Sequence, residues 1–136
     1  MNDTLNPKDT PVDTTTLPVI AANLGIGKLV RHIFLCADAT KPKCAGKEAS
    51  NEVWEHLKKR LAGSGLMAGD QCTFRTKANC LRVCEHGPIA VVYPDGIWYH
   101  SVTKEVVDRI VDEHLAGGKP VAEYVFAVNP LNRNGE

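Results

Sequence analysis

Two apolar strands separated by an amphipathic helix constrain what this chain can fold into. Residues 29 to 36, LVRHIFLC, are a β-branched and aromatic run that predicts a buried strand. Between residues 47 and 62 apolar side chains recur at helical spacing, and Gly63 is expected to cap that helix. The alternating segment QCTFRT, residues 71 to 76, predicts a second strand. A strand, a helix and a strand in succession form a crossover, so we expect the two strands to be parallel.

The second half of the chain predicts a hairpin and another helix. The segment IAVVYPDGIWYHSV holds two apolar runs around Pro94-Asp95-Gly96, a sequence typical of a tight turn. Thr103 is expected to cap a helix that runs to Leu115, and residues 121 to 125 are expected to add a short helical turn. The predicted fold class is therefore α/β, a mixed sheet in the order β-α-β-β-β-α with flanking helices.

The length of 136 residues predicts one domain with tails. We expect a flexible tail over residues 1–28, a domain over 29–127 and a second tail over 128–136. The 16 basic and 16 acidic residues cancel, so the overall charge favours neither nucleic acid nor a membrane surface as partner. The first thirty residues resemble neither a secretory signal nor a transit peptide, and no stretch approaches the ~20 apolar residues of a membrane span. A cytoplasmic protein is expected.

Four of the five cysteines fall at strand ends or in loops. Cys36 and Cys44 enclose seven residues, whereas Cys80 and Cys84 enclose three. The loops after two parallel strands lie at one end of the sheet, so the four sulfur atoms are expected to converge there. In a reducing compartment, such a set indicates a metal site more often than disulfides.

Zinc and an iron-sulfur cluster are the two candidates for a site of four thiolates. Zinc knuckles space their ligands two to four residues apart, so the seven-residue gap favours the larger cluster. The plant-type and bacterial cysteine runs of other ferredoxins are absent, and the pair Cys84 and His86 lacks the second histidine pair of a Rieske centre. No C-x-x-C occurs, so thioredoxin-type thiol exchange lacks its usual dithiol.

Three segments resemble the thioredoxin-like [2Fe-2S] ferredoxins and the related small cluster-bearing subunit of NADH:quinone oxidoreductase. They are RHIFLCADATKPKCAGKEA, RTKANCLRVCEHGPIAVVYPDGIWY and VVDRIVDEHLAGGKPVAEYVF, and the similarity spans about residues 31 to 126. The resemblance implies a thioredoxin-like fold, one-electron transfer without enzymatic activity, and often a homodimer. It also implies one [2Fe-2S] cluster, bound by Cys36, Cys44, Cys80 and Cys84.

Basic side chains outnumber acidic ones near these cysteines in sequence. Asp38, Glu48 and Glu85 oppose the basic set, which comprises Lys41, Lys43, Lys47, Arg75, Lys77 and Arg82. If these side chains surround the cluster, they favour its reduced state and steer an acidic redox partner; otherwise they are ordinary solvated loop charges. Gly87-Pro88 is expected to shape its loop so that backbone N–H groups approach the cluster sulfurs.

The fifth cysteine and the function each leave an alternative open. Cys72 alternates with Phe74, which favours a buried core thiol over a substitute ligand. The leading functional prediction is a one-electron carrier that meets a reductase and an acceptor enzyme. The alternatives are a cluster-bearing subunit of a larger NAD(H)-linked dehydrogenase or hydrogenase, and an iron-sulfur regulatory module.

Overall fold

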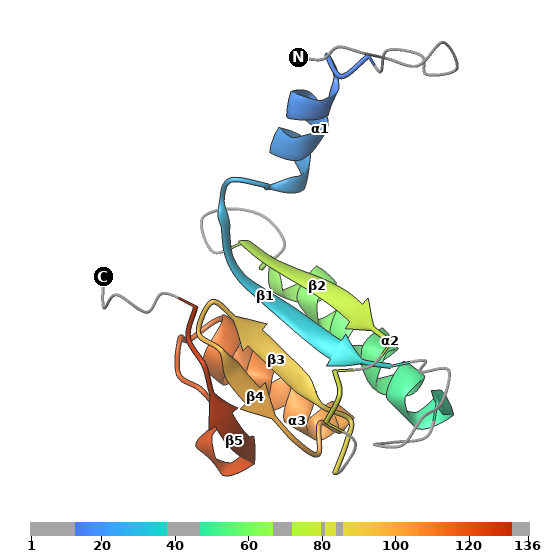
Figure 1. The fold of residues 1–136 in the computed structure, drawn as a ribbon, viewed down its shortest axis with the longest axis vertical. Helices are drawn as coiled ribbons and strands as arrows, with labels where there is room; N and C mark the ends of the chain where they lie inside the picture. Colours follow the sequence, from blue (N-terminus) through green and yellow to red (C-terminus); the bar gives the residue numbers. More distant parts are fainter. Residues whose placement is uncertain (1–12, 38–46, 67–71, 80, 84–85, 132–136) are drawn as a thin grey trace.

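A five-stranded mixed sheet organises the chain, as Figure 1 shows for a computed structural model. The structure describes residues 13–37, 47–66, 72–79, 81–83 and 86–131. The strands follow the spatial order β2-β1-β3-β4-β5. Their bounds are β1 Leu29–Cys36, β2 Cys72–Ala78, β3 Ala90–Tyr93, β4 Ile97–Tyr99 and β5 Val125–Val128.

The pairing of the central strands confirms the predicted crossover and hairpin. Strand β1 runs parallel to β2 and antiparallel to β3. Within this ladder Phe34 lies opposite Thr76 on one side and Val91 on the other. The turn between β3 and β4 contains Gly96, whose φ of 69° favours glycine. The predicted α/β class is therefore confirmed.

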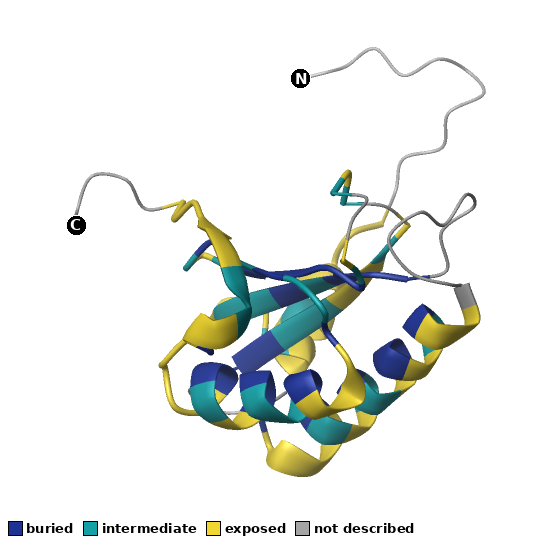
Figure 2. Ribbon diagram, turned by 90° about the horizontal axis from the view of Figure 1, so that it is seen from below, coloured by how far each residue is buried: buried dark blue, intermediate teal, exposed yellow. Residues whose placement is uncertain are grey.

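Two long helical segments cover one face of the sheet, as Figure 2 shows. These are α2 (Lys47–Ser64) and α3 (Lys104–Arg109), the latter continued by a π-helical stretch, Ile110–Leu115. Thr103 caps α3 as predicted, since its side chain accepts a hydrogen bond from Val106 N. The core lies between these helices and the sheet, where Leu35, Leu57 and Ile110 are fully buried.

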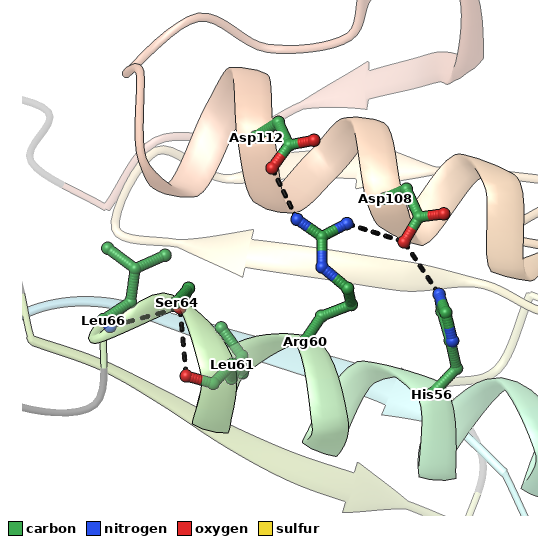
Figure 3. A network of polar contacts seen from close by, with 7 residues as sticks. All are labelled: His56, Arg60, Leu61, Ser64, Leu66, Asp108 and Asp112. Carbon is green, nitrogen blue, oxygen red and sulfur yellow. Dashed lines mark hydrogen bonds and ion pairs between the residues drawn. The ribbon is translucent and has the colours of Figure 1, made fainter.

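Ion pairs join the exposed edges of the two helical segments (Figure 3). Arg60 of α2 donates to Asp108 at 2.6 Å and to Asp112 at 2.5 Å, and His56 Nε2 lies 2.7 Å from Asp108 Oδ1. The hydrogen bonds from Arg60 and His56 lower the pKa of Asp108. Surface pairs of this kind add little stability individually, and a network that shares its members contributes more than isolated pairs.

Helix α2 ends later than its sequence predicts. Gly63 was expected to cap it, but the helix continues to Ser64, and the left-handed glycine is Gly65, with φ of 79°. The Ser64 hydroxyl donates to Leu61 O at 2.9 Å and accepts from Leu66 N at 3.2 Å (Figure 3). These bonds satisfy backbone groups at the helix end, so no glycine is needed at position 63.

The C-terminal segment forms a strand as well as the predicted turn. A 3₁₀ turn, Ala122–Tyr124, leads into β5, which pairs with β4. Asn129 N then donates to Gly96 O at 2.7 Å, and a Cβ on Gly96 would overlap the Asn129 backbone. The glycine of the hairpin turn therefore also admits the chain that follows β5.

Helix α1 (Leu17–Leu24) lies within the segment for which the sequence predicted only a tail. Proline stands in its first turn and Gly25 ends it with φ of 87°, so these two residues are its start and stop signals. None of its residues is buried. In the described part of the chain, no helix has both the length and the apolarity to cross a bilayer.

Candidate metal centre

Cys36, the first predicted ligand, is the last residue of β1 and is only 3% exposed. Its backbone N–H donates to Ile89 O at 3.0 Å. In return, Ile89 N–H donates to Cys36 Sγ at 3.2 Å. The sulfur atom is therefore held between the end of β1 and the segment that enters β3, and it already receives one N–H donor.

Parallel pairing brings Cys36 beside the segment that leads toward the second cysteine pair. Cys36 lies opposite Ala78, the last residue of β2, and Ala37 N–H donates to Ala78 O at 2.9 Å. This arrangement confirms that the segments after β1 and β2 leave the same end of the sheet. The other three predicted ligands, Cys44, Cys80 and Cys84, lie outside the described residues, so the ligand set stays a prediction.

The described residues of the loop between β2 and β3, 79, 81–83 and 86–89, include two unusual backbone conformations and are held by hydrogen bonds. Arg82 and His86 have φ of 73° and 55°, in the left-handed region that few non-glycine residues adopt. His86 O accepts from Ser101 N at 2.7 Å, and Pro88 O accepts from Val102 N at 3.0 Å. These bonds fix the chain immediately before Ile89, whose N–H reaches the sulfur of Cys36.

The donor to Cys36 agrees with the role expected for Gly87-Pro88, although the sequence does not identify Ile89. A backbone N–H belongs to every non-proline residue, so only the neighbouring Gly-Pro signals it. The sulfur environment fits a bound cluster, because a thiolate ligand is stabilised by N–H donors and by exclusion of bulk water. Within the described residues, no three Cys, His, Asp or Glu side chains gather as a metal site.

Only part of the predicted basic set lies among the described side chains, and its members differ in exposure: Lys77 is exposed. Arg82 is exposed, whereas Arg75 stacks over the Trp54 ring at 5.5 Å and so packs against α2. A groove of about 280 Å³ beside Pro88 is bordered by charges of both signs, Glu52, Lys104 and Glu105. Lys41 and Lys43 lie outside the described residues, as does the side chain of Lys47. The basic surface stays a prediction.

Cys72 lies at the opposite end of the parallel strand pair from Cys36. It pairs with Leu29, whereas Cys36 pairs with Ala78, and six residues of strand span about 20 Å. Cys72 is fully buried, and a Cβ added to Gly25 would stand 2.9 Å from its sulfur. These contacts support the core interpretation of Cys72 over the substitute-ligand alternative.

No family model matches the chain, but individual proteins do. A 2Fe-2S ferredoxin of Aquifex aeolicus is 35% identical over 102 residues, covering 71% of this chain and 89% of the relative. A 2Fe-2S ferredoxin of Clostridium pasteurianum is 34% identical, covering 66% of this chain and 89% of the relative. The solved structure of a thioredoxin-like [2Fe-2S] ferredoxin from Aquifex aeolicus aligns with a TM-score of 0.64 at 33% identity, covering 73% of this chain and 92% of that one. The mixed sheet, the position of Cys36 and these similarities agree, and the chain belongs to the thioredoxin-like [2Fe-2S] ferredoxins, a family defined by its [2Fe-2S] cluster.

Proposed function

We propose that this chain is a one-electron carrier that holds a single [2Fe-2S] cluster through Cys36, Cys44, Cys80 and Cys84. The observation that carries the proposal is the buried Cys36 sulfur with its N–H donor, at the end of the sheet where both cysteine-bearing segments begin. Family membership supports the cluster type. All-cysteine ligation is the norm for such clusters.

A [2Fe-2S] cluster, when bound, supplies a one-electron couple without making a bond to a substrate. The work of this chain is to hold the ligands and set the reduction potential. The Ile89 N–H, 3.2 Å from Cys36 Sγ, stabilises negative charge on that sulfur and so favours the reduced state. No acid, base or nucleophile is needed for this task, so the protein acts as a carrier and not as an enzyme.

The partners follow from this role. A reductase supplies electrons, and an acceptor enzyme removes them through the end of the sheet where Cys36 lies. The basic residues Lys41, Lys43 and Arg82 would favour an acidic partner surface, with attraction that weakens as salt rises. We further propose a homodimer in the cytoplasm, as the family resemblance suggests.

Metal and sulfide analysis tests the cluster directly. The protein is purified anaerobically, assayed for iron and acid-labile sulfide, and examined by electron paramagnetic resonance before and after dithionite. Two irons and two sulfides per chain, with a spin-one-half signal only after reduction, are the expected result. Zinc without sulfide would contradict the proposal and leave the zinc-site alternative.

Gel filtration of a cell extract distinguishes a free carrier from a subunit of a larger dehydrogenase or hydrogenase. A free carrier is expected to elute as a small species, whereas a subunit of a dehydrogenase or hydrogenase would elute within a large assembly. Elution in such an assembly would replace the free-carrier proposal without affecting the cluster assignment.

A further inference from the structure

The chain that leaves β4 contacts the segment that carries the N–H donor to Cys36. Tyr99, the last residue of β4, pairs with Ala90, the first residue of β3. Residues 100–102 follow β4 directly and hydrogen-bond to residues 86–88, which lead to the donor. We call residues 100–102 the support segment, because they hold the chain just before the N–H group that reaches the sulfur atom.

Two consecutive N–H groups of the support segment donate to the chain before Ile89. Ser101 N–H donates to His86 O at 2.7 Å, and Val102 N–H donates to Pro88 O at 3.0 Å. In an extended strand, consecutive N–H groups point to opposite sides, so a regular strand directs only every second N–H toward one neighbour. The backbone of the support segment must therefore change direction at Ser101.

The left-handed conformation of Ser101 provides this change of direction. Its φ is 54°, a value that few residues other than glycine adopt. The surrounding residues hold it there, since the Ser101 hydroxyl oxygen lies 2.8 Å from His100 Nδ1, and His100 N–H donates to Tyr124 O at 3.0 Å. A non-glycine residue keeps such a conformation only where its surroundings determine it, and such positions cluster at functional sites.

The support segment acts on the peptide unit that contains the donor to the sulfur. Pro88 C=O and Ile89 N–H belong to one planar unit, in which the two groups point in opposite directions. This unit accepts from Val102 N–H on one side and donates to Cys36 Sγ, at 3.2 Å, on the other. Pro88 and Ile89 are buried, so water does not compete for these bonds. The bond from Val102 both fixes the orientation of the unit and polarises its N–H group toward the sulfur.

We propose that Ser101 is a positioning residue that helps to set the reduction potential of the cluster. Its left-handed conformation aims Val102 N–H at Pro88 O, and the peptide unit that receives this bond presents Ile89 N–H to the ligand sulfur. A donor to a ligand sulfur favours the more negative reduced cluster, so the support segment raises the potential. The inference rests on the proposed function, because it takes Cys36 as a ligand.

Redox titration of two variants of the cluster-bearing chain tests this inference. Ser101→Thr keeps the hydroxyl but adds a branch at Cβ, which disfavours a positive φ, so the support segment should shift and the potential should fall. The equilibrium constant for reduction should decrease about threefold or more, as expected for the loss of one hydrogen bond. Ser101→Gly removes the hydroxyl but adopts a positive φ readily, so it should keep the wild-type potential. The pair separates the backbone conformation from the hydroxyl group.

Gly65→Ala is the matched control for backbone strain. Gly65 has φ of 79°, and a Cβ there would meet no atom within 4 Å, so alanine adds strain without a clash. The next residue, Leu66, accepts from Thr73 N–H in the part of β2 farthest from Cys36. Gly65→Ala should therefore unfold at a lower urea concentration and keep the wild-type potential. A decrease in potential as large as that in Ser101→Thr would overturn the inference.

The measured potentials decide the inference, with iron and sulfide content determined on the same samples. A wild-type potential in Ser101→Thr would overturn it, and so would an equal decrease in Ser101→Gly. If Ser101→Thr does not fold, a backbone ester at position 102 removes the Val102 N–H itself and should lower the potential; an unchanged potential would again overturn the inference. A wild type without a [2Fe-2S] cluster would instead overturn the proposed function, and this inference with it.

Discussion

Hydrogen bonds at the two ends of the sheet, the Cys36 end and the end with the β3–β4 turn, join different kinds of groups. At the Cys36 end a backbone N–H reaches a single sulfur, and the remaining predicted ligands come from loops. At the hairpin-turn end, four side chains are linked in series by hydrogen bonds, and we call this set the polar chain: Arg31, Asp95, His114 and Tyr99. Arg31 donates to Asp95 at 2.9 Å, His114 Nε2 lies 2.7 Å from the same oxygen, and His114 Nδ1 lies 2.8 Å from the Tyr99 hydroxyl.

The direction of each hydrogen bond in that polar chain can be deduced from its fixed members. Val121 N–H donates to the Tyr99 oxygen at 3.0 Å, so the hydroxyl hydrogen of Tyr99 is available for His114 Nδ1. The other nitrogen of His114 then donates to Asp95, which accepts from Arg31 as well. His114 is fully buried and is satisfied as the neutral ring. These hydrogen bonds satisfy the side chains of the hairpin-turn end among themselves, whereas the Cys36 end is the one that we propose to hold a cluster.

Removing the thiol of Cys36 should give the largest effect. Cys36→Ala is expected to lose most of its iron and sulfide, because a cluster with three thiolates is open to water and loss of metal. The comparison is measured as iron and sulfide per chain after anaerobic purification. Cys72→Ala is the matched control and should keep the full complement, since Cys72 lies at the other end of the strand pair. Equal iron loss in both variants would contradict the assignment.

Removing one hydroxyl from the polar chain should destabilise the fold without loss of cluster. Tyr99→Phe leaves Val121 N–H and His114 Nδ1 unpartnered in the core, at about 1–3 kcal/mol for each unsatisfied group. Urea unfolding should therefore show a loss of about 2 kcal/mol or more, with iron content unchanged. Tyr93→Phe makes the same change at a half-buried tyrosine on the other side of the sheet and should cost under about 0.5 kcal/mol. Similar losses in both would show that the polar chain adds nothing.

The sequence predicts the Cys36 end better than the hairpin-turn end for a physical reason. Strand periodicity identifies β1, and parallel pairing then follows from the crossover, so the neighbourhood of Cys36 is accessible from local patterns. Arg31, Asp95 and His114 come from three separate elements, and nothing in their local sequence indicates that they meet. Their contact depends on how the elements pack.

The missed elements show the same limit at shorter range. The segment LPVIAANLG contains start and stop signals for a helix. The sequence did not predict this helix because the segment is apolar on all sides, whereas the usual signal of a helix is an amphipathic pattern. Strand β5 has four residues and its partner is β4, which only the tertiary fold supplies. Cys44, Cys80 and Cys84 lie outside the described residues, so the complete ligand set still rests on the sequence and the family.

Acid should weaken the hairpin-turn end before it affects Asp95. Burial lowers the pKa of His114, although Asp95 opposes this shift, and burial also lowers that of His32. A histidine with a lowered pKa is disfavoured as the cation in the folded state, so its contribution is intact above the unfolded value of about 6.5 and is lost as pH falls below it. Burial raises the pKa of Asp95, but the bonds from Arg31 and His114 outweigh it and the net pKa is lowered. The stability that the Asp95 carboxylate contributes is therefore lost only as the pH falls below 3.8, the ordinary pKa of an aspartate.

Unfolding measured from pH 8 to 5.5 tests the assignment to His114. The wild type should lose stability across the lower part of this range, and His114→Gln should show a shallower decline, with the rest due to His32. An unchanged decline in His114→Gln would show that the buried histidine does not couple folding to pH. The variant is expected to be less stable at every pH, since Gln cannot reach both partners.

The smallest expected effect compares positive charges at the two ends of the sheet. Arg82→Gln should lower the reduction potential, because a nearby cation favours the more negative reduced cluster. Gln is matched to Arg82 in its response to the positive φ, so the change is mainly one of charge. Lys119→Gln removes an exposed charge next to Gly118, which lies near Arg31 at the hairpin-turn end, and should leave the potential unchanged.

Adding Lys41→Gln and Lys43→Gln to Arg82→Gln should lower the reduction potential further. The triple variant should also be reduced more slowly by its partner at low salt, because the electrostatic attraction of the partner is screened at high salt. Potentials measured by redox titration that do not change in the triple variant would mean that these side chains are ordinary solvated loop charges, and that the N–H donor of Ile89 and the burial of Cys36 set the potential instead.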